Sequence, residues 1–363
     1  MLAKNNTPFA AAGFEHFHRD GQLMGIIVCR ASYDLAHDGS LSLRNEQNLI
    51  YADEFSGPVQ NSALLKAGDI IPFRPNTDIT ITGFTYAPDA RRSQSWTFGI
   101  RIGLYERILR CYGPRDWVPA GVKNGKPAWH LTEPAMVDRV LLDYRYAQGS
   151  VVFGAPVDNV SQDNPIGAFL LDPDITPKNA VVPAALIENP AQPVCNPFIQ
   201  TAPQGLSPVS PFWKTRLRFA GTYSDIWQEK REPELPQDFD YRFYQAASPG
   251  MIYRGFMAGD EKIVLHQLTY GGGATDFCLP AIQPYACFEW RDGRKVYARL
   301  NLDGVHLNLM SQKPPWRLEL TWRVWAVICP DFLKADLYWV SLGSSFLGGM
   351  ACCDVCGLAE GFC

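Results

Sequence analysis

The cysteines near the end of the chain have the spacing that most resembles a reactive site. Cys352, Cys353, Cys356 and Cys363 lie within the final dozen residues, among several glycines. Cys353 and Cys356 are spaced as in a zinc knuckle or a redox motif. A four-thiolate zinc site usually has two such knuckles separated by a longer insert, and Cys363 follows too closely for that. A Gly/Cys tail without a site, a zinc site and a redox site are the alternatives; we predict no metal.

Paired carboxylates are the next candidate for chemistry. Asp238 and Asp240 flank Phe239, and two carboxyl groups are the machinery of most glycoside hydrolases. Aspartates in turns more commonly cap the local backbone, and we interpret this pair in that way. The sequence contains no Gly-x-Ser-x-Gly elbow, phosphate-binding loop or dinucleotide fingerprint. We therefore expect no catalytic residue and no cofactor.

Aromatic and arginine side chains are concentrated between residues 213 and 243. These residue types are enriched at the energetic centres of protein interfaces. The same density also fits an ordinary aromatic core beneath a junction between two strand-rich parts. The candidate partner-binding residues are Trp213, Arg216, Tyr223, Trp227, Phe239 and Arg242.

Composition limits the class of protein. Of the 363 residues, 47% are hydrophobic and 12% aromatic, enough for a substantial core. A formal charge of -4 provides no basic surface for nucleic acid or for an anionic membrane. The N-terminus lacks a signal pattern, and no apolar run reaches the roughly 20 residues that span a bilayer. We expect a cytoplasmic protein whose other six cysteines are reduced and mostly buried.

Alternating patterns predict strands on both sides of an irregular centre. Residues 26–35, 98–104 and 316–328 alternate with period two, and Asp38-Gly39 and Asp303-Gly304 are typical hairpin turns. In the last of these strands the apolar face begins at Trp316, while Arg317, Glu319 and Arg323 are expected on a solvated face. Between residues 165 and 208 prolines recur too often for long regular elements.

These patterns predict a mainly β fold with two strand-rich lobes, sandwich- or barrel-like, joined by an irregular Pro-rich central region. The predicted divisions are residues 1–120 for the N-terminal lobe, 121–245 for the central region and junction, 246–330 for the C-terminal lobe, and 331–363 for a Gly/Cys-rich tail.

Several short motifs, in their order, resemble those of one bacterial family. They are residues 6–10, 52–55 and 66–78 in the first part, and 163–167, 187–190, 220–227 and 235–240 in the middle. The chain resembles, over about residues 5 to 328, the bacterial domain of unknown function twenty-one sixty-nine. Members of that family are associated with type VI secretion loci, near genes for VgrG spike, PAAR-like and effector proteins. The cysteine-rich tail departs from the family pattern.

The resemblance implies a non-enzymatic, cytoplasmic adaptor or chaperone that binds a toxin effector and helps to load it onto the VgrG/PAAR spike. No catalytic residue can be transferred, because the family has none established. The Pro-rich centre and the junction then become candidates for a partner groove, which could act by strand addition or as an aromatic groove. The alternatives are a carboxylate-based β-sandwich hydrolase and a metal-binding structural component of the secretion machinery.

Overall fold

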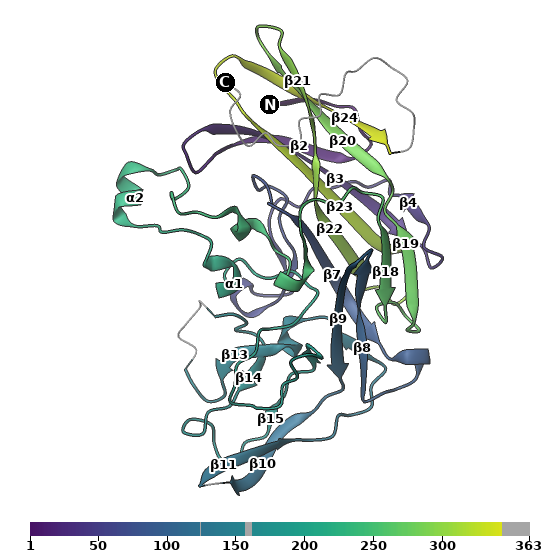
Figure 1. Ribbon diagram of the computed structural model, residues 1–363, viewed down its shortest axis with the longest axis vertical. Helices are drawn as coiled ribbons and strands as arrows, with labels where there is room; N and C mark the ends of the chain where they lie inside the picture. Colours follow the sequence, from purple (N-terminus) through teal and green to yellow (C-terminus); the bar gives the residue numbers. More distant parts are fainter. Residues whose placement is uncertain (124, 157–161, 343–363) are drawn as a thin grey trace.

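The computed structural model describes residues 1–123, 125–156 and 162–342. The described chain is mainly β, as predicted, with only two short α-helices, both in the central region. Its strands form three larger sheets and three small ones, and the sheets are stacked along an elongated molecule (Figure 1).

The largest sheet has eight strands and combines the two ends of the sequence. Its main path runs β12-β7-β22-β23-β3-β2, with β17 paired to β7 and β4 paired to β3. Strands from the two predicted lobes are direct neighbours, since β22 lies parallel to β7 and β23 antiparallel to β3. The strands are β2 Ala10–Phe17, β3 Leu23–Leu35, β4 Leu41–Leu43, β7 Thr77–Tyr86, β12 Arg139–Leu141, β17 Ile252–Tyr253, β22 Asn301–Leu309 and β23 Trp316–Val327.

Two further sheets also mix early and late strands. The five-stranded sheet has the order β16-β9-β8-β18-β19, and the four-stranded sheet has the order β1-β24-β20-β21. The five strands are β8 Ser95–Ile102, β9 Tyr105–Tyr112, β16 Ile187–Glu188, β18 Lys262–His266 and β19 Ala274–Cys278. The four strands are β1 Leu2–Asn5, β20 Ile282–Trp290, β21 Lys295–Arg299 and β24 Phe332–Ser341. All of β24 thus lies in the stretch of residues 331–363 that was expected to be a tail.

The central region contains only short elements, in keeping with its prolines. They are β10 Asp116–Lys123, β11 Lys126–Leu131, β13 Gln148–Val152, β14 Ala168–Leu170, β15 Val182–Pro183, α1 Lys214–Leu217, α2 Asp225–Lys230 and the 3₁₀ turns η3 Tyr144–Tyr146 and η4 Tyr241–Tyr244. The remaining elements outside it are η1 Val59–Asn61, β5 Glu54–Phe55, β6 Leu64–Lys66, η2 Pro88–Ala90 and η5 Pro249–Met251.

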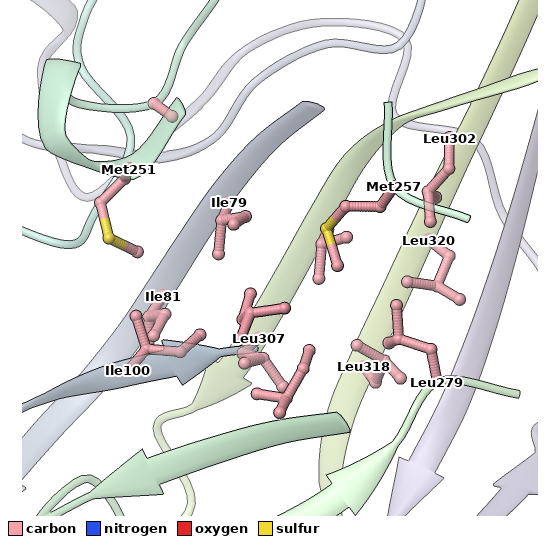
Figure 2. Packing of buried hydrophobic residues seen from close by; sticks show 14 of the residues in the cluster. Ile79, Ile81, Ile100, Met251, Met257, Leu279, Leu302, Leu307, Leu318 and Leu320 are labelled. Atoms are coloured by element: carbon pink, nitrogen blue, oxygen red, sulfur yellow. The ribbon is translucent and has the colours of Figure 1, made fainter. Parts of the chain in front are cut away.

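One hydrophobic core is shared by the three larger sheets. Figure 2 shows Ile79 of β7, Leu307 of β22 and Leu320 of β23 gathered with Ile100 of β8. Burying side chains of this size contributes about 1.5–3 kcal/mol each. The apolar face predicted for residues 316–328 is the face that enters this core, so the strand pattern is confirmed there.

Three sequence-based predictions are wrong in detail. Asp303-Gly304 is not a hairpin turn: β22 continues through it with a register shift, and the Asp303 carboxylate is buried beside Arg323. The second face of β23 is exposed at Arg317, as predicted, but Glu319 and Arg323 on the same face are buried. Cys195 and Cys278 are exposed rather than buried; Cys278 lies on the edge strand β19, where it alternates with the buried Phe277.

Candidate functional site

A loop excursion, residues 219–240, projects from the body of the molecule and carries α2 (Figure 1). We call it the arm. Its two ends are joined at the base, where the Asp240 amide donates to the Phe219 carbonyl at 3.0 Å. Beside this bond the Asp238 carboxylate accepts from the Thr222 amide at 2.9 Å and from the Thr222 hydroxyl at 2.7 Å. The arm is therefore a closed loop of the kind that frequently carries function.

The inside of the arm is ordered by its own side chains. The Ser224 hydroxyl caps α2 by accepting from the Trp227 amide at 3.2 Å. The Trp227 indole Nε1 donates to the Glu234 carbonyl at 2.9 Å, which connects α2 to the segment of the arm that returns to the body. Arg231 pairs with the Glu234 carboxylate at 3.1 Å and also donates to the Leu235 carbonyl. These bonds fix the arm before any partner is present.

Exposed apolar side chains lie at the beginning of α2 and just before it. Tyr223 is 54% exposed and Ile226 67% exposed, and Trp227 is half-buried. The Tyr223 and Trp227 rings meet edge to face at 4.7 Å. We call these three residues the arm tip. Preorganised, exposed aromatic groups of this kind can bury a large area on binding at a small cost in side-chain entropy.

The arm rests on the hairpin between β2 and β3. Arg231 Nη2 donates to the Arg19 carbonyl at 2.7 Å, and Arg19 Nη1 donates to the Phe239 carbonyl at 3.3 Å. The Tyr241 ring stacks on Phe73 at 4.2 Å and on His18 at 5.3 Å. The arm therefore contacts the β2–β3 hairpin both at its base and through Arg231, directly after α2, and it leaves Tyr223 and Ile226 exposed.

The six predicted partner-binding residues lie in this region but divide by burial. Tyr223 and Trp227 belong to the arm tip, and Arg242 is exposed at the arm base, paired with Asp240 at 2.8 Å. Trp213, Arg216 and Phe239 are buried. The expectation of direct partner contact therefore falls on the first three residues, and the other three support them. Ile226, the most exposed of the tip residues, was not predicted.

The buried members of the set anchor the segment that leads into the arm. Trp213 meets the Tyr144 ring edge to face at 5.1 Å. Arg216 donates from Nε to the Phe243 carbonyl and from Nη1 to the Val209 carbonyl, both at 2.9 Å. Burial lowers the pKa of Arg216 to about 10, so the guanidinium remains charged at neutral pH.

A cleft of about 400 Å³ lies beside α1. Among the residues that line it are Asp163, Gln200, Thr201, Pro203, Trp213 and Arg218. The cleft brings together the Pro-rich centre and the junction, as expected for a partner groove. Its aromatic members, Tyr144 and Trp213, are buried, and the other residues that line it are both polar and apolar, so exposed aromatic rings do not line this cleft.

A group of buried charged side chains lies on the second face of the largest sheet, the face that carries Glu319 and Arg323. Arg30 pairs with Asp69 at 3.1 Å and with Glu319 at 2.9 Å, and Lys66 reaches Glu319 at 3.2 Å. Arg323 extends the group by pairing with Asp303. We call the group the buried ion cluster; its members are Arg30, Lys66, Asp69, Arg74, Asp78, Asp303, Glu319 and Arg323.

His306 borders the buried ion cluster, and its pKa is lower than the usual value for histidine. Its Nδ1 lies 2.9 Å from the Thr80 hydroxyl, and its Nε2 lies 3.9 Å from the Glu319 carboxylate. Burial lowers the pKa of His306 to about 4, against the opposing effect of Glu319. Burial acts to raise the pKa of Glu319, but Arg30 and the other neighbouring cations outweigh it and lower that pKa to about 2.

The cavity among these groups is too small for a substrate. It measures about 30 Å³, which is room for about two water molecules. The cluster therefore stabilises the segment of residues 66–78 on the sheet, and its geometry does not favour the hydrolase alternative.

Of the other candidate groups, the structure describes the paired carboxylates but not the C-terminal cysteines. Asp240 caps η4 by accepting from the Arg242 amide at 2.9 Å, so the capping interpretation is confirmed for this residue. Cys352, Cys353, Cys356 and Cys363 lie outside the described residues. Within residues 1–123, 125–156 and 162–342, no three His, Cys, Asp or Glu side chains are grouped to hold a metal ion, and no helix has the length and apolarity to cross a membrane.

The family comparison covers nearly all of this architecture. A family model described as an uncharacterized protein conserved in bacteria (DUF2169) matches residues 20–323, which include the arm, the cleft and the buried ion cluster. Neither the search of curated proteins nor the search of solved structures produced a match.

Proposed function

The chain belongs to the DUF2169 family, and from that premise we propose that it is a non-enzymatic adaptor or chaperone that binds a type VI secretion effector and helps to load it onto the VgrG/PAAR spike. The family's association with type VI secretion loci supports the proposal, and the proposed site of action is the cytoplasm, where effectors are loaded.

The observation that carries the proposal is the arm tip. Tyr223, Ile226 and Trp227 are held outward by a loop whose base and interior are closed by its own hydrogen bonds. Such a surface has the character of an interface hot spot, which is usually a small group of residues enriched in Trp, Tyr and Arg. A protein that works by holding another protein needs a surface of this kind rather than a reactive group.

The test is purification of the tagged protein from its native host under secretion-active conditions, with identification of the bound proteins by mass spectrometry. We expect a stoichiometric toxin, PAAR-like or VgrG spike protein. The double variant Tyr223→Ser/Ile226→Ser should weaken its binding at least about tenfold, because truncated hot-spot residues cost about 2 kcal/mol or more. Trp227 is kept because its indole holds the arm together.

The matched control is Leu104→Ser, which removes a fully exposed aliphatic side chain from the turn between β8 and β9. Recovery of the wild-type protein without any companion would contradict the adaptor function. Equal recovery of the partner by the wild type and the double variant would move the partner site away from the arm tip.

A further inference from the structure

The arm is strongly acidic. Its residues 219–240 contain six acidic side chains and two basic ones, a net charge of -4, which equals the formal charge of all 363 residues. The acidic members are Asp225, Glu229, Glu232, Glu234, Asp238 and Asp240, and the basic members are Lys230 and Arg231.

Three of the six carboxylates form no ion pair. Asp238 is engaged by Thr222, Glu234 is paired with Arg231, and Asp240 is paired with Arg242. Asp225, Glu229 and Glu232 are exposed, and among the described residues they form no ion pair. Asp225 lies in the first turn of α2, where a negative charge favours the helix, and all three carboxylates are available to a partner.

These carboxylates border the apolar arm tip. Asp225 is adjacent to Ile226 in α2, and Glu229 lies three residues after Ile226, so it faces the same side of the helix. Glu232 follows the end of α2. Basic groups outside the arm engage its base: Arg242 pairs with Asp240, and the Arg19 guanidinium donates to the Phe239 carbonyl. The three carboxylates without an ion pair instead lie on α2 and just after it, near Ile226.

We propose that the arm tip docks a partner segment in which lysine or arginine side chains flank an apolar stripe. This inference rests on the proposed adaptor function and specifies the chemistry of the surface that the adaptor recognises. An apolar stripe would cover Tyr223, Ile226 and Trp227, while basic flanks would meet Asp225, Glu229 and Glu232. Complementary charges of this kind speed association and exclude partners with acidic flanks.

The test uses two synthetic amphipathic peptides of about 18 residues, five helical turns, with the same leucine stripe. One has lysine on its polar face and the other has glutamate. Binding to the full chain is measured by fluorescence anisotropy at low and raised salt. We expect the lysine peptide to bind at least about tenfold more tightly than the glutamate peptide, and to lose affinity as salt screens the charges.

Charge reversal provides the decisive comparison. Glu229→Lys/Glu232→Lys should weaken the lysine peptide about tenfold and strengthen the glutamate peptide, while Asp225 stays in place in the first turn of α2. The control Glu106→Lys/Glu133→Lys makes the same change in net charge at exposed positions outside the arm and should change neither affinity. Unchanged hydrogen exchange in α2 shows that the reversal leaves the arm folded.

Equal binding of the two peptides, binding of neither, or an equal effect of the control reversal would overturn the inference. Recovery of a toxin or spike protein that is indifferent to Glu229→Lys/Glu232→Lys would also overturn it, while leaving the adaptor function intact. Failure of the wild type to recover any such protein from its host contradicts the adaptor function, whatever the peptides do.

Discussion

Single residues of the buried ion cluster hold together parts of the chain that are far apart in sequence. Arg30 of β3 and Glu319 of β23 come from opposite ends, and Asp69 lies in the segment before β7. Removing one partner of a buried pair leaves an uncompensated charge and costs about 3–5 kcal/mol. The side chains are therefore interdependent, and a change at any of them is felt across the sheet.

His306 should make the protein sensitive to mild acid. Its pKa is about 4 in the folded protein and about 6.5 in the unfolded chain, so the unfolded chain binds more protons between these values. Stability is then fully present above pH 6.5 and is lost as the pH falls toward 4. Between pH 7 and pH 5 the contribution of His306 lowers the free energy of unfolding by about 2 kcal/mol. In urea unfolding experiments, His306→Gln should abolish this pH-dependent decrease.

The exposed His130 provides the control for this measurement. His130→Gln should leave the pH dependence as in the wild type. Glu319, with a pKa lowered to about 2, contributes stability that is lost only below about pH 4.5, so it does not obscure the range above pH 5. An identical slope in wild type and His306→Gln would contradict the assignment.

At the scale of elements, the arm depends on a glycine at its base. Gly221 has φ +77°, and a Cβ there would lie 2.9 Å from the Asp238 carboxylate and from the Pro236 side chain. Gly221→Ala should loosen the base, because a left-handed alanine costs about 1 kcal/mol before this contact is counted. We expect faster hydrogen exchange in α2 and faster tryptic cleavage at Lys230 and Arg231.

Gly103→Ala is the control, because it places an alanine at positive φ in the turn between β8 and β9, outside the arm. Gly103 also has a positive φ, but nothing lies within 4 Å of the added Cβ. Its replacement should leave exchange in α2 unchanged. The melting temperature should fall little in Gly221→Ala, because the arm tip is outside the shared core; a large fall would show that the arm supports the body.

A strand could be predicted from the sequence where its alternating apolar residues alone determine which face is buried. The alternation from Trp316 to Trp322 marks the face of β23 that enters the core. The other face was unpredictable, because Glu319 and Arg323 are buried by segments remote in sequence. The same remoteness explains Asp303-Gly304, whose turn-like composition is overridden by the pairing of Asp303 with Arg323.

The sequence predicted the segment that contains the candidate site, but not which of its side chains are exposed. The density of aromatic residues marked the segment from Trp213 to Arg242, but composition cannot separate an anchor from a contact. Trp213 and Phe239 are fully enclosed, whereas Tyr223 is displayed because the loop closed by Asp238 turns it outward. Ile226 gave no signal in the sequence, since a lone isoleucine beside polar residues is unremarkable.

At the scale of the whole molecule, the early and late strands should unfold together. Ile81 of β7 and Leu320 of β23 are both fully buried in the one core shared by the larger sheets. Ile81→Ala and Leu320→Ala should each lower the stability by about 2–5 kcal/mol. Calorimetry should show both changes as a shift of the same single transition.

Two transitions, each moved by only one of the variants, would contradict this expectation. Limited proteolysis gives a second view: residues 1–120 and 246–330 should not survive as separate stable fragments, because each would retain sheets with missing neighbours. Exposed substitutions such as Leu104→Ser should shift the transition little.

The pairing of β1 with β24 has a consequence for synthesis on the ribosome. Leu2 of β1 lies opposite Ala335 of β24, and β3 likewise pairs with β23, which is synthesised much later. The strands made first therefore lack their neighbours until nearly the whole described chain has left the exit tunnel. During this interval the nascent chain presents open sheet edges, which invite aggregation. Slow translation or premature termination should thus deplete this protein more strongly than one built from local hairpins.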